Sequence, residues 1–279
     1  MHAYKIQESV YFTIVIKETR EYIVGAILEV DGLSLQFGGV KALDNVSYSI
    51  EKGEIFSLIG PNGAGKTSML NCISGLYQPT NGSIRFKGQE IINMKPYKRT
   101  TLGIARAFQN IALFAHMSVL DNLKLGRHTL MNSGLLSGGL YFGKASKEEI
   151  IHRREVEEVI EFLELQDIRH TPVGKLPYGL QKRVEVGRAL ALNPELILLD
   201  EPMAGMNSSE KEMMARMILD MHEVKGTTVV LIEHDLGVVM NLSHHIAVLD
   251  FGKQIGFGTP EEIQKNTAVI KAYIGEEAI

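Results

Sequence analysis

The sequence has one cysteine, no excess of positive charge and no apolar run long enough to cross a bilayer. Cys72 cannot form an intramolecular disulfide, and we expect it to be a small buried hydrophobe rather than a redox group. The longest apolar stretches, such as 10–16 and 229–232, fall far short of the roughly 20 residues of a membrane-spanning helix. Charged side chains interrupt the first 21 residues, which therefore do not form a signal peptide. We expect a cytoplasmic protein that meets a membrane only through a partner.

The charge balance argues against nucleic acid as a partner. The 279 residues carry 29 basic and 33 acidic side chains, for a net charge of −4. Proteins that bind nucleic acid present a positive surface to the phosphates. The nearest basic cluster here, residues 95–99, is short and typical of a solvated face. The length suits one large α/β domain, or one such domain with a subdomain.

The clearest motif is a glycine-rich segment between a predicted strand and a predicted helix. It reads Gly60, Pro61, Asn62, Gly63, Ala64, Gly65, Lys66, Thr67, Ser68. This is the phosphate-binding pattern G-x-x-x-x-G-K-[ST] in its required setting. Glycine lets the backbone turn tightly against an anion, and the helix start adds unpaired N–H groups. We expect Lys66 to reach the terminal phosphates and Thr67 to offer its hydroxyl to Mg²⁺.

Polar side chains follow several other predicted strands. Asp200 and Glu201 end a buried apolar strand, at the edge where α/β sheets bind their ligands. Asp200 suits Mg²⁺ as an oxygen ligand or second-sphere group, and Glu201 suits an attacking water. Gln109 and His234 also follow strands, although each alone would more often be a surface or structural residue. Phe37 suits stacking on adenine as well as it suits a core position.

The region between about 110 and 190 has helical patterning and predicts a helical subdomain inserted in the α/β core. Capping-box spacing predicts helix starts at Ser146 and Ser209. The first of these helices has a predicted apolar stripe of Ile150, Ile151, Val156, Val159, Ile160 and Leu163. The second has a methionine stripe that we expect in the core: Met213, Met214, Met217 and Met221.

In this order and at these separations, the motifs resemble those of the ATP-binding subunits of ABC transporters from residue 27 onward. The resemblance implies an α/β fold, a P-loop NTPase core of the ABC ATPase type, with an antiparallel β subdomain. The inserted α-helical subdomain would occupy about residues 110–190. Residues 26–279 would form the ATP-binding domain, and residues 1–25 an N-terminal extension without an assigned role.

The family signature, Leu-Ser-Gly-Gly-Gln, has two candidate positions. Residues 136–140 match more letters, but no helix leading to the acidic strand follows them. Residues 176–181 stand at the right distance, with Pro177 in place of Ser and Leu180 in place of Gln. One hydroxyl contact to the γ-phosphate is therefore absent, and backbone N–H groups at the helix start offset part of the loss. We expect Pro177 at the first helical position. Asn207 stands where many relatives have Asp, which leaves a cross-subunit contact open.

By this resemblance, two cassettes meet head to tail and clamp two molecules of ATP with Mg²⁺. The implied catalytic residues are Lys66, Gln109, Glu201 and His234. The implied metal ligands are Thr67, Gln109 and Asp200. The implied nucleotide-binding residues are Phe37, the loop from Gly60 to Ser68, and the signature residues Pro177, Tyr178 and Gly179.

Three further features resemble the subgroup that imports branched-chain amino acids: the signature at 177–179, Gly-Met-Asn at 205–207, and a glycine-rich insert near residue 135. The implied partners are a second cassette, identical or a sister protein, a membrane permease near Leu113 and Phe114 and, indirectly, a solute-binding protein. The chain would sit at the cytoplasmic face of the membrane.

Three alternatives stay open. The chain could serve an importer for another solute, act on nucleic acid or ribosomes as a soluble ABC ATPase, or bind ATP without turnover. The lack of a basic surface argues against the second alternative, and the adjacent carboxylates Asp200 and Glu201 argue against the third.

Overall fold

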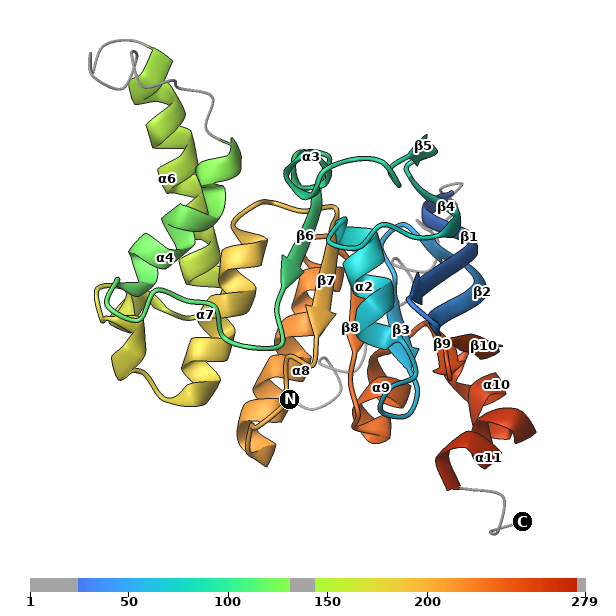
Figure 1. Cartoon of the computed structure of the whole chain (residues 1–279). Coiled ribbons are helices and arrows are strands. Elements are labelled where there is room, and N and C mark those ends of the chain that lie inside the picture. Colours follow the sequence, from blue (N-terminus) through green and yellow to red (C-terminus); the bar gives the residue numbers. More distant parts are fainter. Residues whose placement is uncertain (1–24, 131–143, 275–279) are drawn as a thin grey trace, which may run out of the picture.

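The computed structural model describes residues 25–130 and 144–274. Two sheets organise this part of the chain (Figure 1). The first is antiparallel, in the order β2-β1-β4-β5, and its strands are β1 (Ala26–Phe37), β2 (Val40–Glu51), β4 (Asn81–Phe86) and β5 (Gln89–Glu90). Alternate residues of β2 are buried, as expected of a sheet with one face on a core.

The second sheet has six strands in the order β10-β9-β3-β8-β7-β6. All neighbouring strands are parallel except β10, which pairs antiparallel with β9. Every residue of β3, β7 and β8 is buried, which explains their continuous apolar sequences. The strands are β3 (Ile55–Ile59), β6 (Ile104–Ala107), β7 (Leu196–Asp200), β8 (Thr228–Ile232), β9 (His245–Asp250) and β10 (Lys253–Gly258).

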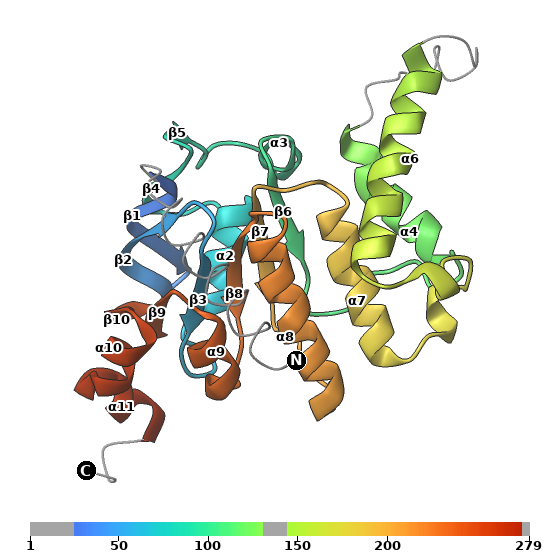
Figure 2. The ribbon, with the colours of Figure 1, turned by 180° about the vertical axis from the view of Figure 1, so that it is seen from behind.

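Helices cover both faces of the six-stranded sheet. Figure 1 shows α2 (Lys66–Ser74) on one face, and the view from behind in Figure 2 shows α8 (Ser208–Glu223) and α9 (Leu236–Leu242) on the other. The remaining helices beside the sheets are α3 (Pro96–Thr101), α10 (Pro260–Lys265) and α11 (Thr267–Ile274). The predicted α/β fold with an antiparallel β subdomain is therefore confirmed.

A helical arm lies beyond β6, with α7 between the sheet and the outer helices in both views. The arm comprises α4 (Val119–Gly126), α6 (Lys144–Phe162), α7 (Tyr178–Leu190) and the 3₁₀ turns η1 (Arg127–Leu130), η2 (Gln166–Ile168) and η3 (Val173–Lys175). Its apolar side chains join those of β7 and α8 in one cluster. The start of the chain, the signature candidate at 136–140 and the insert near residue 135 lie outside the described residues.

Three predicted helix starts were wrong by one or two residues. Helix α6 begins at Lys144, so Ser146 lies inside it. A capping box does open α8, but Asn207 is its N-cap and pairs with Glu210, two residues before the predicted Ser209. Pro177 is the N-cap of α7 rather than its first helical residue.

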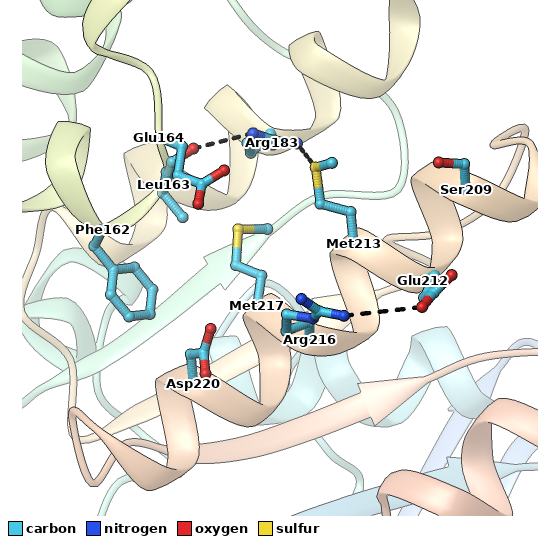
Figure 3. Close-up of a pocket in the computed structure, with 10 residues that line it drawn as sticks. All are labelled: Phe162, Leu163, Glu164, Arg183, Ser209, Glu212, Met213, Arg216, Met217 and Asp220. Atoms are coloured by element: carbon cyan, nitrogen blue, oxygen red, sulfur yellow. Dashed lines mark hydrogen bonds and ion pairs between the residues drawn. The ribbon is translucent and has the colours of Figure 1, made fainter. Parts of the chain in front are cut away.

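The predicted apolar stripes are buried only where another element covers them. Met214, Met217 and Met221 are in the core, but Met213 is half exposed, so its predicted core position was wrong. Its sulfur contacts Arg183 in a groove between α7, the end of α6 and α8 (Figure 3). Ile150 and Ile151 are also exposed, in the part of α6 that extends past α7, whereas the other four residues of that stripe are buried.

A buried arginine closes the carboxyl end of α2. Arg99 is 1% exposed. Its guanidinium donates to the carbonyls of Cys72 (2.6 Å), Ile73 (2.8 Å), Ile92 (2.9 Å) and Met94 (3.0 Å). Carbonyls at a helix end lack partners within the helix, and a cation there also complements the helix dipole. Arg99 thus fixes the far end of the helix that begins at the phosphate loop.

Candidate active site

The glycine-rich loop is held in a shape that two of its glycines make possible. Gly60 and Gly65 have φ of 149° and 103°, in the region that favours glycine. A Cβ on Gly60 would lie 2.0 Å from the carbonyl oxygen of Leu249, and one on Gly65 would lie 2.5 Å from that of Ala42. Strands β9 and β2 therefore press the loop from two sides, and a larger residue at either position would displace it.

A cavity of about 380 Å³ opens at this loop. Its lining comes from the start of β2, the loop and first turn of α2, and two residues from other strand ends: Val40, Lys41, Ala42, Asn62, Gly63, Ala64, Gly65, Lys66, Thr67, Ser68, Glu201 and Phe251. The N-cap of α2 is Gly65, which supplies no side-chain acceptor for the first N–H groups of the helix. Those N–H groups and the positive end of the helix dipole suit an anion such as phosphate.

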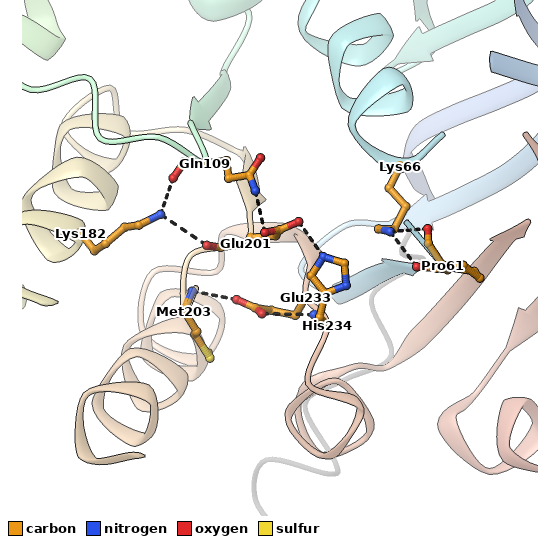
Figure 4. Close-up of polar contacts among 9 residues, drawn as sticks. Pro61, Lys66, Gln109, Lys182, Glu201, Met203, Glu233 and His234 are labelled. Carbon is orange, nitrogen blue, oxygen red and sulfur yellow. Dashed lines mark hydrogen bonds and ion pairs between the residues drawn. The ribbon is translucent and has the colours of Figure 1, made fainter. Parts of the chain in front are cut away.

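The Lys66 ammonium lies at the loop itself. It donates to the carbonyl oxygens of Gly60 at 2.7 Å and Pro61 at 2.9 Å (Figure 4). Burial lowers the pKa of Lys66, while the negative charges of Glu201 and Asp200 act in the opposite direction. The ammonium of Lys66 thus donates to loop carbonyls in this structure. In a phosphate-binding loop, the same ammonium can donate to phosphate oxygens instead.

Asp200 has one oxygen paired and one oxygen free. Its Oδ2 accepts from Nη2 of Arg106 at 2.9 Å, and Arg106 also donates to Asn71 Oδ1 and Ser74 Oγ on α2. Among the described residues, buried Oδ1 has no hydrogen-bond partner. Burial raises the pKa of Asp200, and the charge of Arg106 opposes this shift. A buried, unpaired carboxylate oxygen fits a hard cation or one of the cation's water ligands.

Side chains from the segments after β6 and β8 contact the carboxylate of Glu201, which follows β7 (Figure 4). Gln109 Nε2 donates to its Oε2 at 2.7 Å, and His234 Nε2 lies 2.7 Å from its Oε1. Glu201 itself has φ of 50°, an unusual conformation for a non-glycine residue and one found disproportionately at functional sites. The structure therefore brings together residues from the ends of β6, β7 and β8 that were singled out separately in the sequence.

Other predicted site residues are not among those that line this cavity. Phe37 is half exposed, and its ring meets that of Tyr77 edge to face at a centroid distance of 5.1 Å. The signature residues Pro177, Tyr178 and Gly179 do not line the cavity. Gly179 packs against Glu210 of α8, where a Cβ would lie 2.4 Å from Oε1. One chain therefore presents the phosphate loop and the signature as two separate surfaces.

The sequence motifs missed two buried ionic groups beside Glu201. Lys182 on α7 donates to the carbonyls of Gln109 at 2.5 Å and Glu201 at 3.4 Å. Glu233 accepts from the backbone N–H of Met203 at 2.8 Å and of His234 at 3.3 Å, and burial raises its pKa. The only signal in the sequence was their position next to a motif, because their partners are backbone groups, most of them in distant segments.

Comparison with known proteins identifies the family. A model described as "ABC transporter" matches residues 43–204, more than half of the chain. The chain belongs to the ABC transporter family. It is therefore an ATP-hydrolysing cassette, and the expected family is confirmed. A second model, "Branched-chain amino acid ATP-binding cassette transporter", matches residues 253–279.

Relatives match over almost their whole length. The branched-chain amino acid transport ATP-binding protein BraF of Pseudomonas aeruginosa is 40% identical over 253 residues, covering 90% of this chain and 98% of the relative. LivG of Escherichia coli, with the same description, is 39% identical with the same coverage. A probable LivG from Methanocaldococcus jannaschii is 36% identical over 256 residues.

Solved structures agree with the fold. An ATP-binding cassette of an ABC transporter in its ADP conformation is 34% identical and has a TM-score of 0.78, covering 90% of this chain and all of that chain. A bacterial ABC transporter cassette solved as a dimer is 26% identical with a TM-score of 0.71, covering 84% of this chain and 98% of that chain. Within residues 25–130 and 144–274, no helix is long and apolar enough to cross a membrane.

Proposed function

We propose that this chain is the ATP-hydrolysing subunit of an importer for branched-chain amino acids. Relatives described as transporting these amino acids support the proposal, since the match covers 98% of BraF and of LivG. The match of the branched-chain family model to residues 253–279 supports it as well. The observation that carries the hydrolytic part is the Glu201 carboxylate, which lines the phosphate-loop cavity between Gln109 and His234.

ATP binding requires Lys66 to change partners. The carbonyls of Gly60 and Pro61 hold its ammonium, and phosphate oxygens replace them when the nucleotide enters. The loop N–H groups and the start of α2 supply further donors to the phosphates. Phe37, exposed beside Tyr77, has a ring face available for the adenine.

The carboxylate of Asp200 and the hydroxyl of Thr67 are the groups that suit Mg²⁺, and Gln109 is a third oxygen donor nearby. Mg²⁺ bound with the nucleotide neutralises charge that develops on the transferred phosphoryl group. Burial raises the pKa of Asp200, and Arg106 opposes this shift by pairing with its other oxygen. Arg106 also links Asp200 to Asn71 and Ser74 of α2.

Glu201 orients the attacking water in this proposal, and His234 and Gln109 control its two oxygens. Both contacts are 2.7 Å, and each oxygen can accept a second hydrogen bond, so a water can donate to the carboxylate while these side chains hold it. Positioning and electrostatic stabilisation supply most of the rate enhancement in phosphoryl transfer.

A second cassette completes each site. The signature segment 177–179 does not line the cavity of its own chain, and it begins α7, whose first N–H groups suit a phosphate. A relative solved as a dimer supports this arrangement. We propose a head-to-tail pair in which the signature of one chain covers the phosphate loop of the other.

The permease docks beside Gln109 in this proposal, at the cytoplasmic face of the membrane. Phe114 is half exposed in the turn that follows Gln109, whereas Leu113 packs against the core of the helical arm. Movement of a partner at Phe114 would therefore reach both the arm and the glutamine. A solute-binding protein would act indirectly, through the permease.

The test is reconstitution of the chain with the membrane proteins that co-purify with it. We expect leucine, isoleucine or valine, delivered with the solute-binding protein, to stimulate ATP hydrolysis by the complex. Stimulation by another solute but by none of these three would contradict the substrate class. Hydrolysis that is unaffected by any solute, but stimulated by nucleic acid, would contradict the transport role. Phe114→Asp should reduce permease co-purification.

A further inference from the structure

Side chains of helix α7 form hydrogen bonds to the backbone of the segment that follows β6. Lys182 Nζ donates to the carbonyl of Gln109 at 2.5 Å, and Arg188 Nη1 donates to the carbonyl of Ala112 at 2.6 Å. Between them, Glu185 Oε2 accepts from the N–H of Ala112 at 3.3 Å. The three side chains are spaced at i, i+3 and i+6, so they share one face of the helix. Residues 109–112 are thereby tied to α7.

Lys182 has a second contact that the other two side chains lack. Its ammonium also lies 3.4 Å from the carbonyl oxygen of Glu201, in the core of the molecule (Figure 4). The residue is 1% exposed, and burying an ammonium is costly unless it is hydrogen-bonded. Burial lowers the pKa of Lys182, whereas four carboxylates favour its charged form: those of Glu185, Glu233, Glu201 and Asp200.

Gln109 is consequently held at both ends. Its carbonyl accepts from Lys182, while its side-chain amide donates to Oε2 of Glu201 at 2.7 Å. A change in the position of α7 relative to β7 would move the Gln109 backbone through Lys182. The same displacement would alter the hydrogen bond from the Gln109 amide to the Glu201 carboxylate.

We propose that Lys182 is a positioning residue that couples the orientation of α7 to the placement of the Glu201 carboxylate through Gln109. The inference rests on ATP hydrolysis at Glu201 and does not depend on which solute is transported. A methyl-terminated side chain of similar length would fill the same space without holding either carbonyl. The coupling therefore depends on the ammonium and its donors.

The experiment compares Lys182→Met, Lys182→Arg and the control Arg183→Met in the complex with the permease. Arg183 is the adjacent basic residue of α7, but its hydrogen bonds go to Leu163 and Met213 (Figure 3). We expect kcat for ATP hydrolysis to fall about tenfold or more in K182M, the scale of a lost hydrogen bond from a charged group. The dissociation constant for nucleotide should change less than about threefold.

The remaining variants separate positioning from packing. K182R keeps a cation with donors and should recover kcat to within about threefold of the wild type, while R183M should stay within about twofold. A parallel loss of nucleotide affinity and kcat in K182M, a wild-type kcat in K182M, or an equal loss in R183M would each overturn the proposal. If K182M does not fold, Lys182→Gln replaces it. Failure of K182Q to fold as well would make the role structural and also overturn the proposal.

The outcome is distinguishable from failure of the proposed substrate class. Hydrolysis without added solute reports on Lys182 in either case. Stimulation by leucine, isoleucine or valine reports on the transport proposal alone.

Discussion

The imidazole Nε2 of His234 lies 2.7 Å from Oε1 of Glu201. Since Gln109 donates to Oε2 of the same carboxylate, both oxygens are occupied by side chains from neighbouring strand ends. The carboxylate is therefore held in one orientation, on a backbone with a positive φ that few side chains adopt. We make predictions about His234, about Lys66 of the phosphate loop and about the buried residues Arg99 and Glu233.

Loss of the His234 imidazole should slow hydrolysis without preventing nucleotide binding. We expect His234→Ala to lower kcat by about 100-fold, the cost typical of removing one preorganised hydrogen-bonding group from a reaction centre. Steady-state ATPase kinetics and nucleotide titration measure the two quantities separately. His170, an exposed histidine of the helical arm, is the matched control, and its change to alanine should leave kcat within about twofold. Equal effects of the two substitutions would contradict the role of His234.

Loss of the Lys66 ammonium should act mainly on binding. Lys66→Ala removes the cation that exchanges the loop carbonyls for phosphate oxygens, so we expect ATP affinity to fall about 10- to 100-fold. Isothermal titration calorimetry with magnesium nucleotide measures it. Lys41 lines the same cavity but pairs with Asp44 at 3.1 Å, and Lys41→Ala should weaken binding less than about threefold. Unchanged affinity in K66A would refute the assignment of Lys66.

Arg99 should contribute to stability rather than to catalysis. Arg99→Met removes the guanidinium from four carbonyls, two of them at the end of α2, and should lower the free energy of unfolding by about 3 kcal/mol or more. Urea denaturation measures the change. The neighbouring Lys98 is exposed, and Lys98→Met should change the free energy of unfolding by less than about 0.5 kcal/mol. A loss of similar size in both variants would contradict the capping role.

Glu233 should make stability fall as the pH rises. Burial raises its pKa above the ordinary 4.5, so the folded protein keeps this proton at pH values where the unfolded chain has released it. The free energy of unfolding contributed by Glu233 is fully present below pH 4.5 and is lost as the pH rises through the raised pKa. Glu233→Gln has no proton to release, and its stability should therefore fall less over this range. Denaturation series at several pH values measure both slopes, and identical slopes would contradict the prediction.

Much of the site could be predicted because strand ends at one edge of a parallel sheet converge. An apolar run followed by a polar residue located Gln109, Asp200 and Glu201, and the phosphate-loop pattern located Lys66. Their side-chain partners could not be predicted in the same way. The contacts of Lys182 reach backbone carbonyls more than 15 residues away in either direction, and no sequence period reports such a contact.

Sequence patterns also did not predict which apolar side chains are exposed. Helical periodicity placed Ile150 and Met213 on apolar faces, but whether a face is buried depends on which element covers it. The capping pattern at α8 was shifted because Asn207 and Glu210 satisfy the box two residues earlier than the serine chosen from spacing. Several residues near this position are good N-caps, and tertiary packing selects among them.

The most direct test of the central claim, that the Glu201 carboxylate carries ATP hydrolysis, compares the ATPase rates of Glu201→Gln and the wild type. Both are measured with magnesium ATP in the permease complex. The account predicts that the wild-type protein turns over ATP and that E201Q binds ATP with similar affinity while its rate falls at least about 100-fold. An E201Q protein that hydrolyses ATP at the wild-type rate would contradict it.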